Sequence, residues 1–166
     1  MIILGIDPGT ARCGFGVVEQ DRGDLRLLDC GLIDTPAGTP AGHRLTAIYS
    51  RLTELINTYK PAAVAVEELF YGNNAKTAIA VGQARGVILL AAAHHSIATA
   101  EYTPPQVKLA VTGYGKADKE QVRSMVKTVL NLKELRGPDD TSDAVAVALC
   151  HAFSCRLTDR IGSAVS

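Results

Sequence analysis

The sequence has 166 residues, no net charge and an apolar fraction of 47%, as expected for one globular domain with a core of ordinary size. It contains no apolar run that we expect to cross a bilayer and no basic segment before its first apolar run, so we predict a cytoplasmic protein without a membrane partner. The balanced charge gives no indication of a nucleic-acid partner by composition alone.

The charges are unevenly distributed along the chain. Residues 1–70 contain six Lys or Arg and nine Asp or Glu, whereas residues 71–137 contain nine and four. A basic middle segment beside acidic clusters is what a metal-using enzyme that acts on a polyanion requires. A solvated surface can produce the same distribution, so charge alone does not decide between the two interpretations.

The first ten residues contain the most informative stretch. An apolar run over residues 2–6 ends at Asp7, and Pro8 and Gly9 then predict a sharp turn. Asp7 is therefore expected at the carboxyl end of a buried strand, where an unpaired charge is costly. It can anchor a metal ion, or it can bond to the backbone of the turn.

The next segments predict an antiparallel meander followed by the clearest helix. Strands are expected over Arg12–Gln20 and Leu25–Asp34, separated by a polar turn. Apolar residues at helical spacing predict a helix over Leu45–Tyr59, which Pro61 ends. The short apolar strand Ala62–Val66 follows and leads into a second acidic position, Glu67-Glu68.

The remaining elements complete an α/β pattern. A helix over Ala75–Ala93 is apolar on more than one face, so we expect it to be covered on several sides, partly by a second subunit. A strand over Ile97–Tyr102 and a short helix from Pro104 come next. Asp118 and Gln121 form a capping-box pattern that opens a helix whose basic face carries Lys119, Arg123 and Lys127.

This order of elements predicts an α/β fold with a mixed five-stranded sheet, in which three antiparallel strands precede parallel strands and helices flank the sheet. We assign residues 1–157 to one domain and expect residues 158–166 to form a flexible tail, because they lack periodicity.

Acidic residues recur at the ends of the predicted elements. Asp7 and Glu67 follow strands, and Asp140 and Asp143 open the last helix on one face, although an Asp there can also be a simple cap. Clustered carboxylates repel each other and favour Mg²⁺ or Mn²⁺, and two such ions support phosphodiester hydrolysis. Sugar kinases and actin-like ATPases share a similar opening, but no second copy of it appears here.

With these residues in hand, the sequence resembles the RuvC-type Holliday-junction resolvases over roughly residues 2–153. The resemblance rests on an ordered set of motifs: Ile-Leu-Gly-Ile-Asp-Pro-Gly-Thr at 3–10, Val-Glu-Glu-Leu-Phe at 66–70, Gly-Gln-Ala-Arg-Gly-Val at 82–87, Gln-Val-Lys at 106–108 and Asp-Thr-Ser-Asp-Ala-Val-Ala at 140–146. The first motif is shared by the wider ribonuclease-H-like group, whereas the full set is specific.

The resemblance implies an RNase H-like nuclease fold, a homodimer and paired Mg²⁺-dependent nicks in strands of like polarity at a four-way DNA junction, in recombination and DNA repair. It implies two metal ions, Mg²⁺ or else Mn²⁺, in each active site, and a RuvA–RuvB branch-migration complex as partner. The implied metal-binding and catalytic acids are Asp7, Glu67, Asp140 and Asp143. The competing hypothesis is an RNase H-like protein that cuts or binds RNA.

The DNA-contacting residues follow partly from the resemblance and partly from charge. The family motif places a base-stacking Phe70 after the second acid and functional lysines at Lys108 and Lys119. Arg123 joins them because it lies on the basic helix face, where a track for phosphates is expected. Arg85 can contact DNA or form a structural ion pair.

Two acidic doublets and the cysteines leave further questions. Successive strand residues face opposite ways, so only one of Glu67 and Glu68 is expected to reach a metal, and the motif favours Glu67. The Asp-x-x-Asp spacing favours Asp140 over Asp139, which is then a cap. The four cysteines are expected to be small buried residues, because they form no Cys-x-x-Cys pair.

Overall fold

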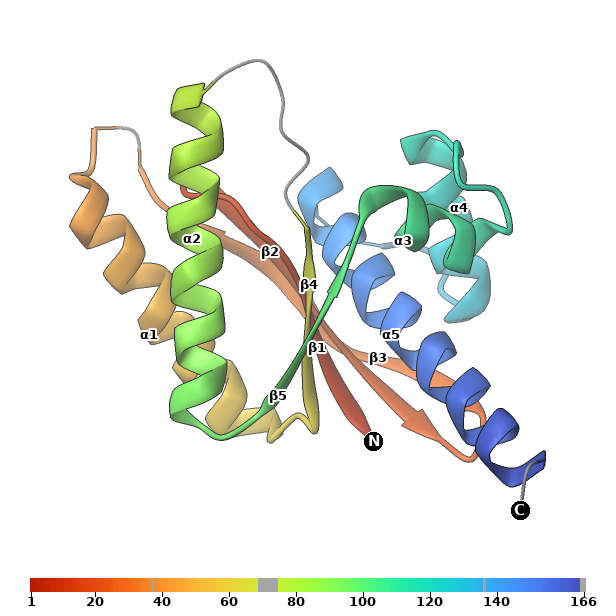
Figure 1. Ribbon diagram of the computed structural model, residues 1–166. Helices are drawn as coiled ribbons and strands as arrows, with labels where there is room; N and C mark the ends of the chain where they lie inside the picture. Colours follow the sequence, from red (N-terminus) through yellow and green to blue (C-terminus); the bar gives the residue numbers. More distant parts are fainter. Residues whose placement is uncertain (37, 69–74, 136, 165–166) are drawn as a thin grey trace.

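The protein folds as one mixed sheet between two layers of helices (Figure 1). The computed structural model describes residues 1–36, 38–68, 75–135 and 137–164, with side chains up to Cys155. In chain order the elements are β1 (Ile2–Asp7), β2 (Arg12–Asp21), β3 (Asp24–Asp34), α1 (Ala41–Tyr59), β4 (Ala63–Glu67), α2 (Ala75–His94), β5 (Ala98–Tyr102), α3 (Pro104–Thr112), α4 (Lys119–Val129) and α5 (Asp139–Ala164).

The strand order β3-β2-β1-β4-β5 confirms the predicted mixed five-stranded sheet. The pairs β1–β2 and β2–β3 are antiparallel, whereas β1–β4 and β4–β5 are parallel. Short turns suffice for the antiparallel pairs, and α1 and α2 provide the long crossovers that parallel pairing needs. The sheet therefore has β1 at its centre.

Each face of the sheet has its own hydrophobic core. Helices α1 and α2 cover one face, and α5 covers the other, with α3 and α4 packed on α5 (Figure 1). Along β1, Leu4 and Ile6 belong to the first core, whereas Ile3 belongs to the α5 core. Since strand side chains alternate, Gly5 and Asp7 also face α5.

Glycines on three neighbouring strand positions bring α5 directly onto the sheet. A Cβ atom at Gly5 would overlap the carbonyl oxygen of Ala144, and one at Gly14 would overlap that of Asp140. A Cβ at Gly16 would lie 2.6 Å from a methyl carbon of Val145. A side chain at Gly14 or Gly16 is therefore excluded, because α5 occupies that space.

The predicted capping box before α4 is also confirmed. The backbone N–H of Gln121 donates to Asp118 Oδ1 at 2.8 Å, and the backbone N–H of Asp118 donates to Gln121 Oε1 at 2.9 Å. This pair satisfies two otherwise free donors at the start of the helix. It makes Lys119 the first residue of α4, at the end of the helix nearest the acidic residues described below.

Helix α2 differs from its prediction in one respect. It is long and apolar enough to cross a membrane by length and composition, so the prediction that no such stretch exists was wrong by this criterion. Its outer face is open in the single chain, where Ile79 and Leu90 are 64% and 47% exposed, so the expected cover by a second subunit stays a prediction. Its inner face packs in the core through Ala84 and Ile88, as a helix of a globular domain does.

The last helix extends beyond the predicted domain boundary. Helix α5 continues to Ala164, whereas the sequence led us to expect a flexible tail over residues 158–166. The boundary at residue 157 stays a prediction.

We predict that Gly5→Ala destabilises the fold by about 1–3 kcal/mol, because the added methyl group must displace the backbone of α5. Gly42→Ala is the matched control. Gly42 lies in α1, and a Cβ atom added there would meet nothing within 4 Å, so that change is expected to be neutral or stabilising. Urea unfolding measures both, and equal stability of the two variants would contradict the packing argument.

Candidate active site

Two acidic side chains meet where the central parallel strands end. Asp7 is the last residue of β1 and Glu67 is the last residue of β4, and the register pairs Ile6 with Val66 just before them. Alternation along β4 puts Ala65 in the α5 core, so Glu67 faces α5 as Asp7 does. The two carboxylates are therefore neighbours on the same face of the sheet.

Helix α5 brings the other two acids to the same place. Asp140 and Asp143 lie in its first turns and share one helix face. All four acids line one cavity of about 330 Å³. The complete lining is Asp7, Glu67, Pro104, Val107, Lys108, Lys119, Val122, Asp140, Asp143 and Ala146. The sequence motifs thus converge in space, with α3 and α4 supplying the opposite wall.

The structure distinguishes the two acids within each acidic doublet. Glu68 is exposed and absent from the cavity lining, and its backbone N–H donates to the carbonyl oxygen of Tyr102 at 2.8 Å. The Asp139 side chain is 61% exposed, and its Oδ1 lies 3.5 Å from Arg123 Nη1. The arrangement agrees with the choice of Glu67 and Asp140 made from the motifs.

The two strand acids are held in an environment that disfavours their charges. Burial, followed by repulsion from Glu67, Asp143 and Asp140, raises the pKa of Asp7 to about 8. Burial and the charge of Asp143 raise the pKa of Glu67 to about 7. Such a group of acids binds protons or metal cations strongly, because either neutralises the repulsion.

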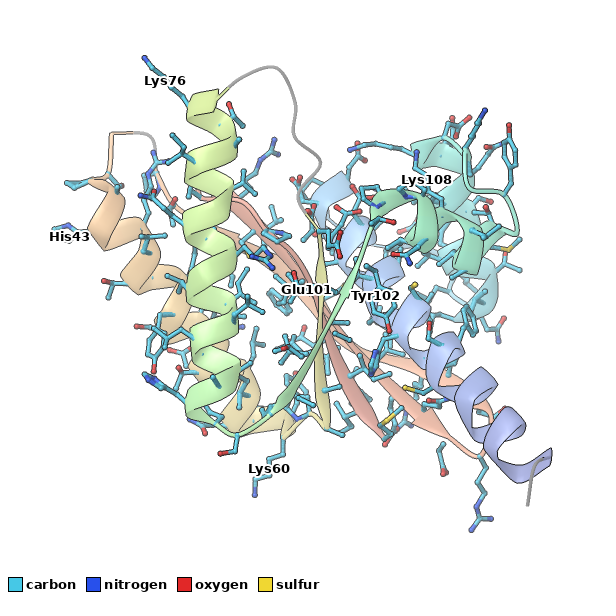
Figure 2. All side chains as sticks on the ribbon, viewed as in Figure 1. His43, Lys60, Lys76, Glu101, Tyr102 and Lys108 are labelled. Atoms are coloured by element: carbon cyan, nitrogen blue, oxygen red, sulfur yellow. The ribbon has the colours of Figure 1, made fainter. Side chains whose placement is uncertain are left out.

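Lysines from α3 and α4 provide positive charge at the wall opposite the sheet. Lys119 Nζ lies 3.4 Å from Asp143 Oδ2, and this acid is the main cause of the raised pKa of Lys119. Lys108 lines the cavity from α3 (Figure 2), and its charge lowers the pKa of Glu67. Both lysines therefore lie where a phosphate entering the cavity would meet them.

Arg12 is a cation at this site that the sequence analysis missed. Its Nε lies 3.6 Å from Asp140 Oδ2. A signal was present, because Arg12 is two residues before Gly14 and so belongs to the strand face that contacts α5. Without the position of α5, however, nothing in the sequence relates Arg12 to Asp140.

The four carboxylates are suitable ligands for divalent cations, although they are not arranged as a coordination shell. Among the described side chains, no three of His, Cys, Asp and Glu are placed to hold one metal ion together. Asp140 and Asp143 are instead paired with Arg12 and Lys119. Four carboxylates with oxygen donors only, two of them with raised pKa values, match the preference of Mg²⁺ and Mn²⁺.

Arg123 is occupied by the loop that leads into α5. Its Nη2 donates to the carbonyl oxygens of Leu135 at 2.7 Å and Gly137 at 3.1 Å. Its Nη1 approaches Asp139 as well. These contacts favour a role in holding the start of α5, and with it Asp140 and Asp143, over the DNA contact predicted from the sequence.

Arg85 lies away from the acids. Its Nε donates to Glu101 Oε2 at 2.7 Å, which joins α2 to β5. Glu101 and Tyr102 point to opposite sides of β5 (Figure 2), and Tyr102 approaches His151 of α5 while Glu101 meets α2. Of the two interpretations of Arg85, the structure contains the ion pair.

Cys13 and Cys150 are buried, as expected for residues that fill a core, whereas Cys30 and Cys155 are only partly buried, so the prediction for those two is wrong. Burial raises the pKa of Cys13 to about 12 and that of Cys150 to about 11, so both are poor nucleophiles.

Phe70, the predicted base-stacking residue, lies outside the described residues. A second cavity, of about 440 Å³ between the end of α3 and α4, has no acidic or basic side chain in its lining.

Comparison with known proteins agrees with this geometry. Residues 3–151 match the family model described as crossover junction endodeoxyribonuclease RuvC. The chain belongs to the RuvC family. A RuvC of Moorella thermoacetica is 57% identical over 92% of this chain and 91% of its own length. A RuvC of Rubrobacter xylanophilus is 53% identical over 97% and 90%.

Solved structures agree with the RuvC fold. Thermus thermophilus RuvC in complex with a Holliday junction substrate is 40% identical to this chain, with a TM-score of 0.91 over 95% of this chain and 96% of the other. The yeast mitochondrial Holliday junction resolvase Ydc2 is 13% identical with a TM-score of 0.70, over 95% and 80%. That more distant likeness concerns the fold alone. The mixed five-stranded sheet and the RuvC structure confirm the predicted fold class.

We predict that the metal-free protein loses stability as the pH rises from about 4 to about 8. The folded state keeps protons on Asp7 and Glu67 that the unfolded state releases near their ordinary pKa values of 3.8 and 4.5. The stabilisation is therefore complete below the unfolded pKa values and is lost as the pH passes the folded ones, by at most about 1.4 kcal/mol per pH unit for each proton.

Urea unfolding in EDTA, compared between the wild type and Asp7→Asn, isolates this effect from other titrating groups. The Asn variant is expected to gain stability relative to the wild type between pH 5 and pH 8, and Mg²⁺ is expected to reduce the difference by stabilising the wild type. A stability difference that does not change with pH would contradict the repulsion argument.

Proposed function

We propose that this RuvC-family chain is a structure-selective endodeoxyribonuclease that resolves four-way DNA junctions by paired, metal-dependent nicks in strands of like polarity. The observation that carries the proposal is the convergence of four carboxylates, from β1, β4 and α5, in one cavity with lysines on its opposite wall. The family relatives named above support the choice of DNA over RNA as substrate.

Asp7, Glu67, Asp140 and Asp143 are proposed as the metal-binding and catalytic acids. Asp7 occupies the end of the central strand, and the pKa of Asp7 responds to all three of the other acids, so it is best placed to share two cations. When bound, Mg²⁺ or Mn²⁺ would supply activation of water and would neutralise negative charge on the phosphate oxygens. Two ions in each site are proposed.

The residues of the chain position the phosphate and hold the metal-binding acids in place. Lys108 and Lys119 attract a phosphate to the wall opposite Asp7 and Glu67, where Lys119 already balances Asp143. The glycine contacts with α5 hold Asp140 and Asp143 against the sheet. Phe70 is proposed to stack on junction bases. Arg123 is kept as a proposed DNA contact only through guanidinium N–H groups that do not already bond to the loop before α5.

A homodimer is proposed through the outer face of α2. Ile79, Gln83, Gly86 and Leu90 are exposed and recur at spacings of four, three and four residues, so they form one stripe. Large apolar residues at both ends of this stripe are unusual for a solvated helix. A Cβ atom added at Gly86 would meet nothing within 4 Å, which leaves space for another helix to approach closely.

A dimer fits the proposed reaction, because two active sites at a fixed separation can cut two strands of a symmetric junction. The RuvA–RuvB branch-migration complex is proposed as partner, and the cytoplasm as the place of action, from the family relationship.

We predict that Asp7→Asn retains junction binding but loses cleavage by at least about 1000-fold, since several kcal/mol of transition-state stabilisation depend on this ligand. The assay uses a mobile four-way junction with Mg²⁺ or Mn²⁺ and maps the product ends. An RNA–DNA hybrid and an RNA hairpin serve as competing substrates. Nicking by the variant at the wild-type rate would refute the proposed metal site.

Glu68→Gln is the matched control for this experiment. It removes the acid next to Glu67, but Glu68 is exposed and is absent from the cavity lining. Cleavage by this variant is expected to stay within about threefold of the wild type, because an exposed charge outside the cavity is screened by water and salt. A loss as large as that of Asp7→Asn would mean that the register of the doublet is wrong.

We predict that Leu90→Asp converts the dimer to a monomer, because a charge would be buried in the proposed apolar seam. Leu109→Asp is the control: Leu109 is 56% exposed, but it lies on α3. Sedimentation velocity distinguishes the two states. Monomeric wild type, or equal dimerisation of both variants, would exclude α2 as the interface.

A further inference from the structure

Arg12 lies outside the cavity lining, next to Asp140 and on the other side of the strand acids from Lys108. In the sheet, β2 with Arg12 and β4 with Glu67 lie on opposite sides of β1 with Asp7. Lys108 follows β5, beyond β4. The acids therefore lie between Arg12 on one side and Lys108 on the other.

The start of β2 is firmly held, so the location of Arg12 is defined. Thr35 Oγ1 donates to the carbonyl oxygen of Thr10 at 2.6 Å, and the Thr35 N–H donates to the carbonyl oxygen of Ala11 at 2.9 Å. A Cβ on Gly9 would overlap the carbonyl oxygen of Arg12, so the turn after Asp7 is closed tightly against this residue. The backbone of Arg12 is thus fixed close to the end of β1.

The side chain of Arg12, in contrast, can exchange its ion-pair partner. It is 57% exposed, and its ion-pair partner among the described residues is Asp140, at 3.6 Å. Exposed ion pairs of this length contribute little to stability. A cation bound by Asp140 would compete directly with Arg12, and a guanidinium is well suited to bind two oxygens of a phosphate instead.

We propose that Arg12 is a phosphate-binding residue that exchanges its ion pair with Asp140 for the DNA backbone when Asp140 takes up a divalent cation. Cations on two sides would then hold the substrate strand: Arg12 from β2, at the edge of the cavity beside Asp140, and Lys108 with Lys119 from α3 and α4, in the cavity lining. The proposal rests on the proposed function, because it assumes that a DNA strand enters this cavity. Arg12 is thus a positioning residue: it would hold the phosphate and would release Asp140 to the cation.

Two measurements without cleavage test this inference. With Ca²⁺ in place of Mg²⁺, so that Asp140 can take up a cation, Arg12→Ala is expected to weaken junction binding about threefold to tenfold at 0.1 M salt, and to reduce the slope of log affinity against log salt by about one. In the DNA-free protein, the same variant is expected to bind Mn²⁺ at least about threefold more tightly by calorimetry, because Asp140 loses its competitor. Arg12→Lys is expected to lie between the wild type and Arg12→Ala in both measurements, since it keeps the charge but not the bidentate geometry.

Arg26→Ala is the matched control. Arg26 is an exposed arginine of the same sheet that pairs with Glu19 of β2 at 2.9 Å. Glu19 lies seven residues along the strand from Arg12, or about 23 Å. This variant is expected to match the wild type in junction affinity, salt slope and Mn²⁺ affinity, and both variants are expected to keep the wild-type melting temperature.

The outcomes separate failure of the inference from failure of the proposed function. If the wild type prefers a four-way junction to duplex DNA and Arg12→Ala has the wild-type affinity and salt slope, the phosphate contact is wrong. If Arg12→Ala binds Mn²⁺ no more tightly than the wild type, the exchange at Asp140 is wrong. If the wild type shows no junction preference at all, the proposed function itself fails.

Discussion

The close approach of α5 to the sheet is the constraint on which the site depends. Gly5, Gly14 and Gly16 leave no side chain between the strands and the helix backbone, and the carbonyl oxygens of Ala144 and Asp140 occupy the space where Cβ atoms would be. This contact brings the first turn of α5 to the ends of β1 and β4. An ordinary side chain at any of these glycines would separate Asp140 and Asp143 from Asp7, because close-packed interiors do not absorb an extra methyl group without a shift.

The same closeness creates an electrostatic cost. Four carboxylates share one cavity, and burial and mutual repulsion raise the pKa values of Asp7 and Glu67 far above their ordinary range. Lys119 and Arg12 offset part of this cost by pairing with the helix acids. The site is thus poised to bind cations, and the groups that balance it without metal are also those that can hold a phosphate.

Local patterns in the sequence predicted most elements and all four acids. The first apolar run and the Pro-Gly turn marked β1 and Asp7, helical periodicity marked α1, and the capping residues marked α4. These features succeed because each depends on residues close together in the chain. The apolar residues of α2 predicted burial partly by a second subunit, and the single chain leaves its outer face exposed, but the pattern does not identify what covers that face.

The sequence by itself determined which carboxylates are available, the elements that carry them and the family to which the chain belongs. Only the tertiary structure decided the partners of the cations: Arg12 pairs with Asp140, Arg85 with Glu101, and Arg123 with the loop before α5. Asp140 is far from Arg12 in the chain, and the two meet only because α5 lies along β2. Long flexible side chains choose their partners by proximity in the fold, and no local pattern encodes that proximity.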